Sequence, residues 1–361
     1  MAREILYTES LRPAGGSLSR VIKTLPEVEE LLPLSPEEKK AFERVSSVYP
    51  FSSTEYYIKL AKKSEAVRKM VLPSLEEIDE EVQSAGEDDP LNEERDLKAP
   101  KLTHRYPDRV LLITTNYCPV LCRYCMRKRN WKKPTFTISE REVEGALSYI
   151  RSNPQIRDVL ISGGDPLTLP LELLERILLE LKKIPHVEVV RIGTRVPVVD
   201  PERVLRRELL SLIERAEKVW INTHFNHPDE ITPEAEEAVR ALLKCGAPVN
   251  NQTVLLKGIN DSAETLEKLF RNLQKIKVRP YYLFHCDPVK GVIHFSTPIT
   301  KGLEILRELF KKLSPLAIPY YAVDGPGGYG KVPLLPHRFR VENGKYLFEN
   351  FNGKWFEMED R

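Results

Sequence analysis

Three cysteines lie close together in the sequence with the spacing C-x3-C-x2-C, at Cys118, Cys122 and Cys125. Iron–sulfur clusters are normally held by four cysteine thiolates. Three thiolates on one short segment can therefore bind three irons of a 4Fe-4S cluster and leave the fourth iron open. The spacing favours such a cluster over structural zinc, which takes four protein ligands, because His104 and His186 do not lie at zinc-finger distance.

The composition of the whole chain bears on its partners and on its cellular compartment. Its 361 residues carry a formal net charge of +2, which gives no general argument for nucleic acid as a partner. No apolar run reaches the roughly 18 residues of a membrane span, and Met1–Ser10 lacks the apolar core of a secretion signal. We therefore expect a cytoplasmic protein without a membrane partner, in which clustered cysteines are more often metal ligands than disulfides.

A glycine-rich segment from Gly325 to Lys331 matches both a dinucleotide fingerprint and a truncated P-loop. Both matches are rejected, because each pattern needs a helix after the glycines, and Val332 and Pro333 follow here instead. The lysine is then either an ordinary solvated charge or a lysine that forms a Schiff base with pyridoxal phosphate. The residue types alone favour the solvated charge.

Strands and helices alternate beyond about residue 105. Six strand–helix units predict a parallel sheet with right-handed crossovers. Six units are fewer than the eight of a closed barrel, so we expect an open, partial barrel with its site at the carboxyl ends of the strands, where the cysteines lie. Strands are predicted at 109–115, 158–162, 188–192, 219–223, 249–255 and 279–284, and helices at 139–151, 171–183, 201–215, 233–245, 263–275 and 301–313.

The segments before the barrel have a different pattern. Region 24–82 has helical periodicity, with a cap at Ser35 and a proline at the first helical position, Pro36. Segment 86–100 is polar and broken by prolines, so it is interpreted as an ordered loop or linker rather than an element.

The segments after the barrel are predicted to be strands. One covers 318–324, and the tail at 338–356 is predicted to form hairpin strands around Asn343-Gly344 and Asn352-Gly353. The predicted organisation is a helical region and linker at 1–104, a partial barrel at 105–315, and a C-terminal strand and tail at 316–361.

An ordered series of motifs resembles the lysine 2,3-aminomutase family of radical SAM enzymes. The resemblance runs from about Leu102 to Pro336 and more loosely into the N-terminal helices. It implies an α/β fold, a partial (β/α)6 radical SAM barrel with a helical N-terminal region and a small C-terminal β-rich extension. The motifs are His104 to Leu111, the three cysteines, Ser162 to Asp165, Arg191 to Val199, Asn222 to Pro228, Asn251 to Leu256, Arg279 to Tyr282, Cys286-Asp287, His294 to Pro298 and Asp324 to Lys331.

The resemblance implies three cofactors. The three cysteines would ligate a 4Fe-4S cluster whose open iron binds S-adenosylmethionine, and Lys331 would be the catalytic lysine that carries pyridoxal 5′-phosphate. The matching residues near S-adenosylmethionine are Ser162, Gly163, Gly164 and Asp165, those near the coenzyme phosphate are Arg105 and Arg109, and those around both cofactors are Asn251, Gln252 and Thr253.

Other interpretations of these residues stay open from their types alone. The segment from Ser162 to Asp165 also suits an ordinary strand-end turn. Arg105 or Arg109 could instead be a surface charge, and each polar residue of 251–253, taken singly, is equally a cap.

Three further positions imply the substrate. By resemblance, Arg127 binds the substrate carboxylate, while Asp287 and Asp324 receive the distal ammonium of L-lysine. Two acids facing one buried ammonium exclude neutral competitors, which would leave the acids unpaired. The implied reaction moves the amino group of lysine from carbon 2 to carbon 3.

Departures from the family pattern bear on metal and assembly. Zinc-linked members carry a cysteine where Ser262 stands and more cysteines in a C-terminal extension, whereas no cysteine follows Cys286 here. We expect no structural zinc, and a homodimer rather than a tetramer. Cys245 and Cys286 are expected to pack as small buried residues.

The remaining expectations concern partners and alternatives. The resemblance implies a one-electron donor such as flavodoxin or ferredoxin. One alternative is a related aminomutase acting on another amino acid or on a protein-bound lysine. Another is a radical SAM enzyme that never uses pyridoxal phosphate and modifies nucleic acid, suggested by the basic run Arg127 to Arg129 and by Trp131.

Overall fold

The computed structural model describes residues 19–336, 338–342, 345–350 and 353–358. The segment Met1–Ser10 and the turn residues Asn343, Gly344 and Asn352 lie outside these ranges. Among the described helices, none combines the length and the apolar character needed to cross a membrane.

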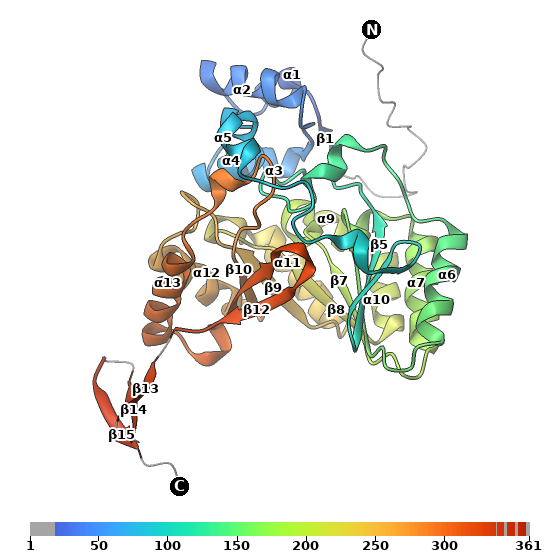
Figure 1. Cartoon of the computed structure of the whole chain (residues 1–361). Helices are drawn as coiled ribbons and strands as arrows, with labels where there is room; N and C mark the ends of the chain where they lie inside the picture. Colours follow the sequence, from blue (N-terminus) through green and yellow to red (C-terminus); the bar gives the residue numbers. More distant parts are fainter. Residues whose placement is uncertain (1–18, 337, 343–344, 351–352, 359–361) are drawn as a thin grey trace.

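A ten-stranded sheet forms the centre of the molecule (Figure 1). Strands β5 to β11 are parallel, each bonded to the next, so the predicted α/β fold is confirmed and the strand predicted at 318–324 joins the same sheet. Alternate residues of β5 are buried, because successive side chains of a strand point to opposite faces. The parallel strands are β5 (Arg109–Thr115), β6 (Asp158–Gly163), β7 (Val189–Gly193), β8 (Val219–Thr223), β9 (Val249–Val254), β10 (Arg279–Phe284) and β11 (Tyr320–Gly325).

Antiparallel strands at both edges have no counterpart in the prediction. Strands β3 (Leu97–Ala99) and β4 (Leu102–Tyr106) extend one edge, so the segment interpreted as a linker contains a strand. At the other edge, the glycine segment is the turn of a hairpin that pairs β11 with β12 (Gly330–Leu334). The edge strands β3 and β12 do not pair with each other within the described chain, so the sheet stays open.

Side chains link these two edges. The backbone N–H of Lys331 donates to the Tyr106 hydroxyl at 2.9 Å, and Arg95 donates to the carbonyls of Gly327 and Gly328. Gly327, Gly328 and Gly330 have φ values of +70°, +84° and +87°. Only glycine adopts this left-handed region without strain, which explains the glycine-rich turn.

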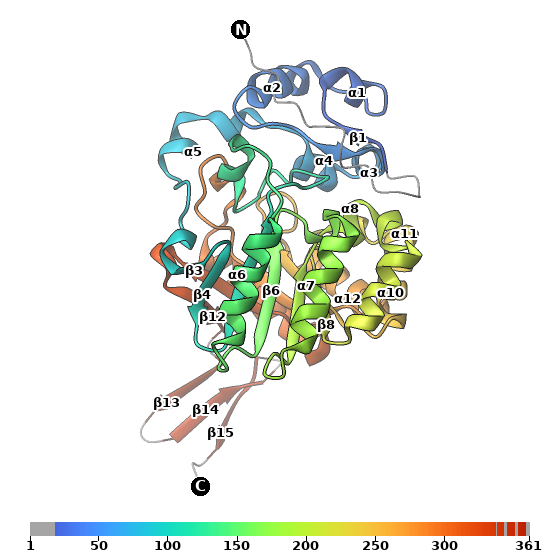
Figure 2. The same ribbon diagram turned by 90° about the vertical axis from the view of Figure 1, so that its right-hand side faces the viewer.

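Amphipathic helices cover the outer face of the sheet (Figure 2). In α7, for example, Leu174, Ile177 and Leu181 are buried at helical spacing. Ser262 caps α12 by accepting a hydrogen bond from Thr265 N. These helices are α6 (Glu140–Arg151), α7 (Leu171–Lys183), α10 (Arg207–Ala216), α11 (Pro233–Lys244), α12 (Ala263–Lys275) and α13 (Ile299–Lys312). Two short and largely buried helices, α8 (Val196–Val199) and α9 (Pro201–Val204), lie between β7 and α10.

The single helix predicted at 201–215 is wrong. Arg206 adopts an extended conformation and divides the segment into α9 and α10. In a continuous helix, Glu208 and Ser211 would lie on the same face as the buried Val204, because they follow it by four and seven residues. Both are polar, so this face could not pack as a core face. The break instead allows α10 to bury Leu209 and Leu212.

The N-terminal region is helical, as predicted, and packs on the cysteine segment, the stretch from Asn116 to Trp131 that carries the three cysteines. The Ser52 carbonyl accepts a hydrogen bond from Leu121 N at 2.9 Å, and the Ser52 hydroxyl donates to the Pro119 carbonyl at 3.0 Å. The Met70 carbonyl accepts from Arg123 N at 3.0 Å. The elements are β1 (Val21–Ile22), α1 (Leu25–Glu29), α2 (Pro36–Ser46), β2 (Ser53–Thr54), α3 (Glu55–Ala61), α4 (Glu65–Val71) and α5 (Glu80–Ser84).

A separate antiparallel sheet follows near the C-terminus and projects from the body of the molecule (Figures 1 and 2). It confirms the predicted hairpin strands. An ion pair between Arg307 of α13 and Glu349 links it to the barrel. Its strands are β13 (Phe339–Glu342), β14 (Lys345–Glu349) and β15 (Trp355–Met358).

Candidate active site

A cavity of about 720 Å³ lies at the carboxyl ends of the parallel strands and extends along the inner face of the sheet. All of the site residues predicted from the sequence line this cavity, except Asn251 and Thr253. Residues from the cysteine segment, the strand ends and the glycine hairpin therefore meet around one space, although they are separated by up to about two hundred positions in the sequence.

A buried charge cluster of Glu77, Arg123 and Lys128 holds the cysteine segment in place. Glu77 accepts hydrogen bonds from Arg123 Nε at 2.9 Å and from Lys128 Nζ at 2.6 Å, and all three side chains are fully buried. Lys128 also donates to the carbonyls of Arg123 and Gly291. Burial lowers the pKa of Lys128 to about 8, against the opposing charge of Glu77. One carboxylate thus neutralises only one of the two cations that flank the cysteines.

The three cysteines are free thiols on one wall of the cavity. Burial raises the pKa of the Cys125 thiol to about 11 and raises that of Cys118 as well. A metal binds the thiolate form, so binding at these cysteines would release their protons. Among the described residues, no three His, Cys, Asp or Glu side chains are arranged to hold a single metal ion. Three thiols around one large cavity do fit the donor set of a cluster.

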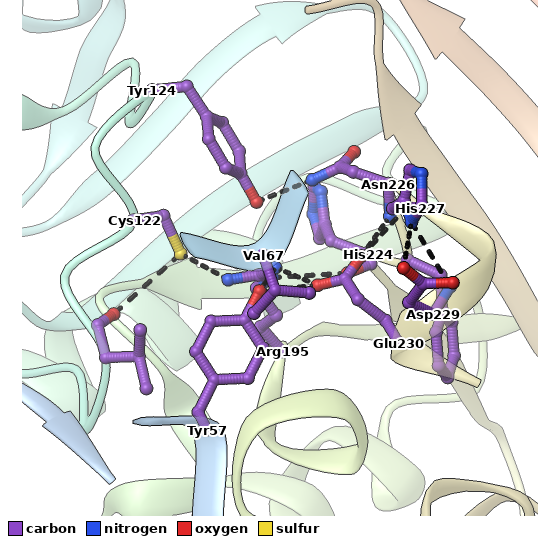
Figure 3. Close-up of polar contacts among 12 residues, drawn as sticks. Tyr57, Val67, Cys122, Tyr124, Arg195, His224, Asn226, His227, Asp229 and Glu230 are labelled. Atoms are coloured by element: carbon purple, nitrogen blue, oxygen red, sulfur yellow. Dashed lines mark hydrogen bonds and ion pairs between the residues drawn. The ribbon is translucent and has the colours of Figure 1, made fainter. Parts of the chain in front are cut away.

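Arg195, which follows β7, also lines the cavity and contacts the cysteine segment. Its Nη1 donates to Cys122 Sγ at 2.9 Å, and its other nitrogens are bound by Glu230, Tyr57 and the His224 carbonyl (Figure 3). The sequence motif from Arg191 to Val199 indicates no role for Arg195. No local pattern predicts it, because its partners come from segments far away in the chain.

The segment from Ser162 to Asp165 lies directly against the cysteine segment. A Cβ atom on Gly164 would lie 2.2 Å from Tyr117 O, and one on Gly163 would lie 2.3 Å from Thr115 O, so only glycine fits at either position. The Asp165 carboxylate accepts hydrogen bonds from Thr194 Oγ1 and from the N–H groups of Leu167, Arg195 and Val196. Its carboxylate therefore fixes the loop that carries Arg195, and all four residues of the segment line the cavity.

The three polar residues of β9 differ in where they point. Gln252 lines the cavity. Asn251 accepts from Phe225 N at 2.7 Å and donates to Phe225 O at 3.0 Å, and Thr253 donates to the same carbonyl at 3.0 Å. Asn251 and Thr253 thus brace the loop after β8 from within the core.

Lys331 and the two aspartates form the second charged group of the cavity. Lys331 Nζ lies 2.8 and 2.7 Å from the two carboxylate oxygens of Asp324 and 4.7 Å from the centre of the Phe284 ring. Burial, together with the Asp324 carboxylate, raises the pKa of Asp287 to about 7, although Lys331 and Arg127 oppose the shift. The two acids and the lysine therefore share one electrostatic environment, and Arg127 acts within it.

Arg127 already has a carboxylate partner that the sequence did not indicate. Its Nε and Nη2 donate to Glu93, which also binds Arg129. Against the cost of burial, the two guanidinium groups lower the pKa of Glu93 to about 2. The Nη1 of Arg127 has no hydrogen bond to any residue that the structure describes, so this nitrogen is the donor left for a ligand.

The two arginines expected near a coenzyme phosphate both line the cavity and are partly engaged. Arg105 donates from Nε to Asp96 at 2.6 Å and from Nη2 to the Leu91 carbonyl. Arg109 pairs with Asp108 at 2.8 Å and stacks on the Tyr106 ring. Each retains donor capacity for an anion, which a guanidinium binds well.

Comparisons with known proteins agree with this arrangement. The model of the radical SAM superfamily matches residues 112–271. A protein of Aquifex aeolicus (strain VF5), provisionally named an L-lysine 2,3-aminomutase, is 53% identical over 94% of this chain and 92% of its own length. The L-lysine 2,3-aminomutase of Acetoanaerobium sticklandii is 42% identical over 92% of this chain and 80% of its own. The glutamate 2,3-aminomutase of Clostridioides difficile (strain 630) is 39% identical over 95% of this chain and 81% of its own. The chain therefore belongs to the lysine 2,3-aminomutase family of the radical SAM superfamily.

Proposed function

We propose that this chain is an isomerase that moves the 2-amino group of L-lysine to carbon 3, with a 4Fe-4S cluster, S-adenosylmethionine and pyridoxal phosphate as cofactors. The observation that carries the choice of substrate is the ion pair of Lys331 with Asp324 beside Asp287, in the cavity that the three cysteines also line.

The acid pair supports lysine over other amino acids. A primary ammonium, that of Lys331, already binds both oxygens of Asp324. The distal ammonium of a bound lysine has the same chemistry. A neutral side chain would leave buried carboxylates unpaired, and a glutamate side chain would bring a third negative charge to Asp287 and Asp324. This argues against the substrate named for the Clostridioides difficile relative.

The roles of the residues follow from their positions. When bound, the cluster with S-adenosylmethionine supplies a hydrogen-abstracting radical, and pyridoxal phosphate supplies a conjugated carbonyl that holds the migrating amino group. In this proposal Cys118, Cys122 and Cys125 hold the cluster and Lys331 holds the coenzyme. The backbone from Ser162 to Asp165 faces S-adenosylmethionine.

Five side chains position the substrate and the coenzyme phosphate. Arg127 binds the substrate carboxylate through Nη1, while Glu93 fixes the other side of its guanidinium group. Asp287 and Asp324 bind the distal ammonium, and Asp287 releases its proton as that cation arrives, because a neighbouring positive charge favours the ionised acid. Arg105 and Arg109 face the coenzyme phosphate.

The proposal also covers the electron donor, the cellular location and the oligomeric state of the enzyme. We include a one-electron donor of the flavodoxin or ferredoxin kind, a cytoplasmic location and a homodimer. Exposed apolar side chains on the C-terminal sheet support self-association, since such patches often mark contact surfaces. They are Phe339, Val341, Trp355, Phe356 and Met358.

The main argument for the alternative, a radical SAM enzyme that modifies nucleic acid without pyridoxal phosphate, was a free basic surface at residues 127–129 beside Trp131. The contacts of these residues do not support it. The basic run at 127–129 is not a free cationic surface: Arg127 and Arg129 pair with Glu93, and Lys128 is buried against Glu77. Trp131 lies against Arg123 and Lys128.

The direct test is anaerobic incubation of the reconstituted enzyme with lysine, glutamate, other amino acids or a lysine-containing peptide, followed by product identification. We expect β-lysine from free lysine and no product from glutamate. Lys331→Ala should lose both turnover and the absorbance near 420 nm, roughly where a lysine–pyridoxal imine absorbs, while Lys301→Ala, on an exposed helix surface, should keep both. A chain that takes up no pyridoxal phosphate, or that converts glutamate or the peptide instead of lysine, contradicts the proposal.

A further inference from the structure

The contact between Arg195 and Cys122 joins a buried cation to one of the three cysteines. Arg195 is 8% exposed, and its Nη1 donates to the sulfur at 2.9 Å (Figure 3). A long side chain seldom keeps one position unless several of its polar atoms have fixed partners. The other two nitrogens of this guanidinium group have such partners.

Each remaining nitrogen of Arg195 has its own partner. Nη2 donates to the Tyr57 hydroxyl at 2.7 Å and to Glu230, and Nε donates to the His224 carbonyl at 3.2 Å. Tyr57 in turn donates to Glu230 at 2.7 Å. The planar group therefore has one orientation, in which Nη1 faces the sulfur.

The anchors are themselves rigid. The second carboxylate oxygen of Glu230 accepts from the backbone N–H groups of Asn226 at 2.6 Å and His227 at 3.0 Å, and both Glu230 and Tyr57 are fully buried. Tyr57 belongs to α3 of the N-terminal region, whereas Glu230 lies between β8 and α11. Two separate parts of the fold thus hold Arg195 against the cysteine segment.

We propose that Arg195 is a positioning residue that raises the reduction potential of the cluster by donating a charge-assisted hydrogen bond to the Cys122 thiolate. The cluster takes one electron from an external one-electron reductant, and its reduced form is the more negative. A hydrogen bond to a ligating sulfur stabilises that form more than the oxidised form, and such bonds are one of the factors that set cluster potentials. The inference rests on the proposed function only in requiring a cluster at the three cysteines.

A merely structural ion pair would have no such effect. Arg203 of α9 offers the matched comparison, because it is 9% exposed, pairs with buried Asp200 at 3.1 Å, and makes no described contact with a cysteine. Loss of either arginine removes one buried ion pair from the same side of the barrel. Only the loss of Arg195 removes the bond to the sulfur.

The test is a potentiometric titration of the anaerobically reconstituted cluster, followed by EPR of the reduced form, without substrate or S-adenosylmethionine. At the potential where the unmodified enzyme is half-reduced, we expect the reduced-to-oxidised ratio of Arg195→Gln to be at least tenfold lower, a shift of about 59 mV for a one-electron couple. Tyr57→Phe, which removes one anchor, should move the ratio less and in the same direction. Arg203→Gln should leave it unchanged.

The iron and sulfide content of each variant separates the possible failures. An Arg195→Gln enzyme with full cluster content and the unmodified potential, or with the same shift as Arg203→Gln, overturns the inference. If Arg195→Gln does not hold the cluster, an unchanged potential in loaded Tyr57→Phe overturns it. An unmodified chain that never takes up a cluster contradicts the proposed function instead.

Discussion

Lys331 Nζ lies 2.7 Å from one carboxylate oxygen of Asp324 and 2.8 Å from the other. The cavity thus contains a primary ammonium on an acid whose side chain is only 10% exposed. The lysine and the acid stand opposite each other in the β11–β12 hairpin. The hairpin therefore presents two groups with different proposed tasks at one point of the cavity, one for the coenzyme and one for the substrate.

Asp324→Asn should weaken the use of lysine more than it weakens cofactor uptake. A charge-assisted hydrogen bond is worth about 1.5–3 kcal/mol, so we expect kcat/KM for lysine to fall roughly 10- to 150-fold. The measurement is the steady-state rate of β-lysine formation. Iron content and S-adenosylmethionine cleavage should match those of the unmodified enzyme. An unchanged kcat/KM would remove Asp324 from the ammonium site.

The pH dependence of lysine use should follow Asp287, whose pKa burial raises to about 7. The substrate ammonium, with a pKa near 10.4, stays charged throughout, so binding improves as Asp287 ionises. We expect kcat/KM for lysine to rise with pH up to about 7 and to fall about tenfold per pH unit well below it. Loss of the Lys331 positive charge would move the inflection upward, because Lys331 is among the cations that oppose the shift.

The matched variant for this profile is Asp287→Asn. It should have a lower kcat/KM and lack the rise through about pH 7, since no carboxyl remains to ionise at that position. If the variant keeps the same inflection, another group is responsible for it.

The predictable part of this protein is what short-range patterns encode. β5, β8 and β10 begin and end at the predicted residues, and so do α7 and α12. Each has an apolar repeat of one period bounded by turn or cap residues. The cysteine spacing and the glycine turn are equally local signals.

The residues that sequence reasoning missed are those whose partners lie far along the chain. Glu77 follows another glutamate and has the local pattern of an exposed turn, yet it binds Arg123 and Lys128. Glu93 lies in a run of charges typical of a solvated linker, yet it holds Arg127. A charge is predicted to be exposed unless its partner is known, and here only the fold brings the partners together.

The stability of the protein should fall in acid as Glu93 is protonated. The guanidinium groups of Arg127 and Arg129 overcome the effect of burial and lower the pKa of Glu93 to about 2, from an ordinary value of 4.5. A lowered carboxyl pKa adds stability above about pH 4.5, and that stability is lost as the pH falls towards about 2. At 1.36 kcal/mol per pKa unit, the contribution is on the order of 3 kcal/mol.

The measurement is the free energy of urea unfolding between pH 5 and pH 3, compared with that of Glu93→Gln. The variant should be less stable at pH 5 and should lose less stability on acidification. Glu94→Gln, at the exposed neighbouring position, is the control. Parallel pH profiles for the unmodified enzyme and Glu93→Gln would show that this carboxylate contributes nothing to the acid response.

Glu77→Gln should lower both the stability of the protein and its capacity to bind iron at the cysteine segment. Removing the single carboxylate of a buried cluster leaves Arg123 and Lys128 as uncompensated charges, a change that typically costs about 3–5 kcal/mol. Both cations belong to the segment that carries the three cysteines, so iron incorporation should fall together with the free energy of unfolding. Glu76→Gln, one residue earlier and exposed, should change neither quantity. A Glu77→Gln protein with normal stability and a full complement of iron would show that the cysteine segment holds its shape without this cluster.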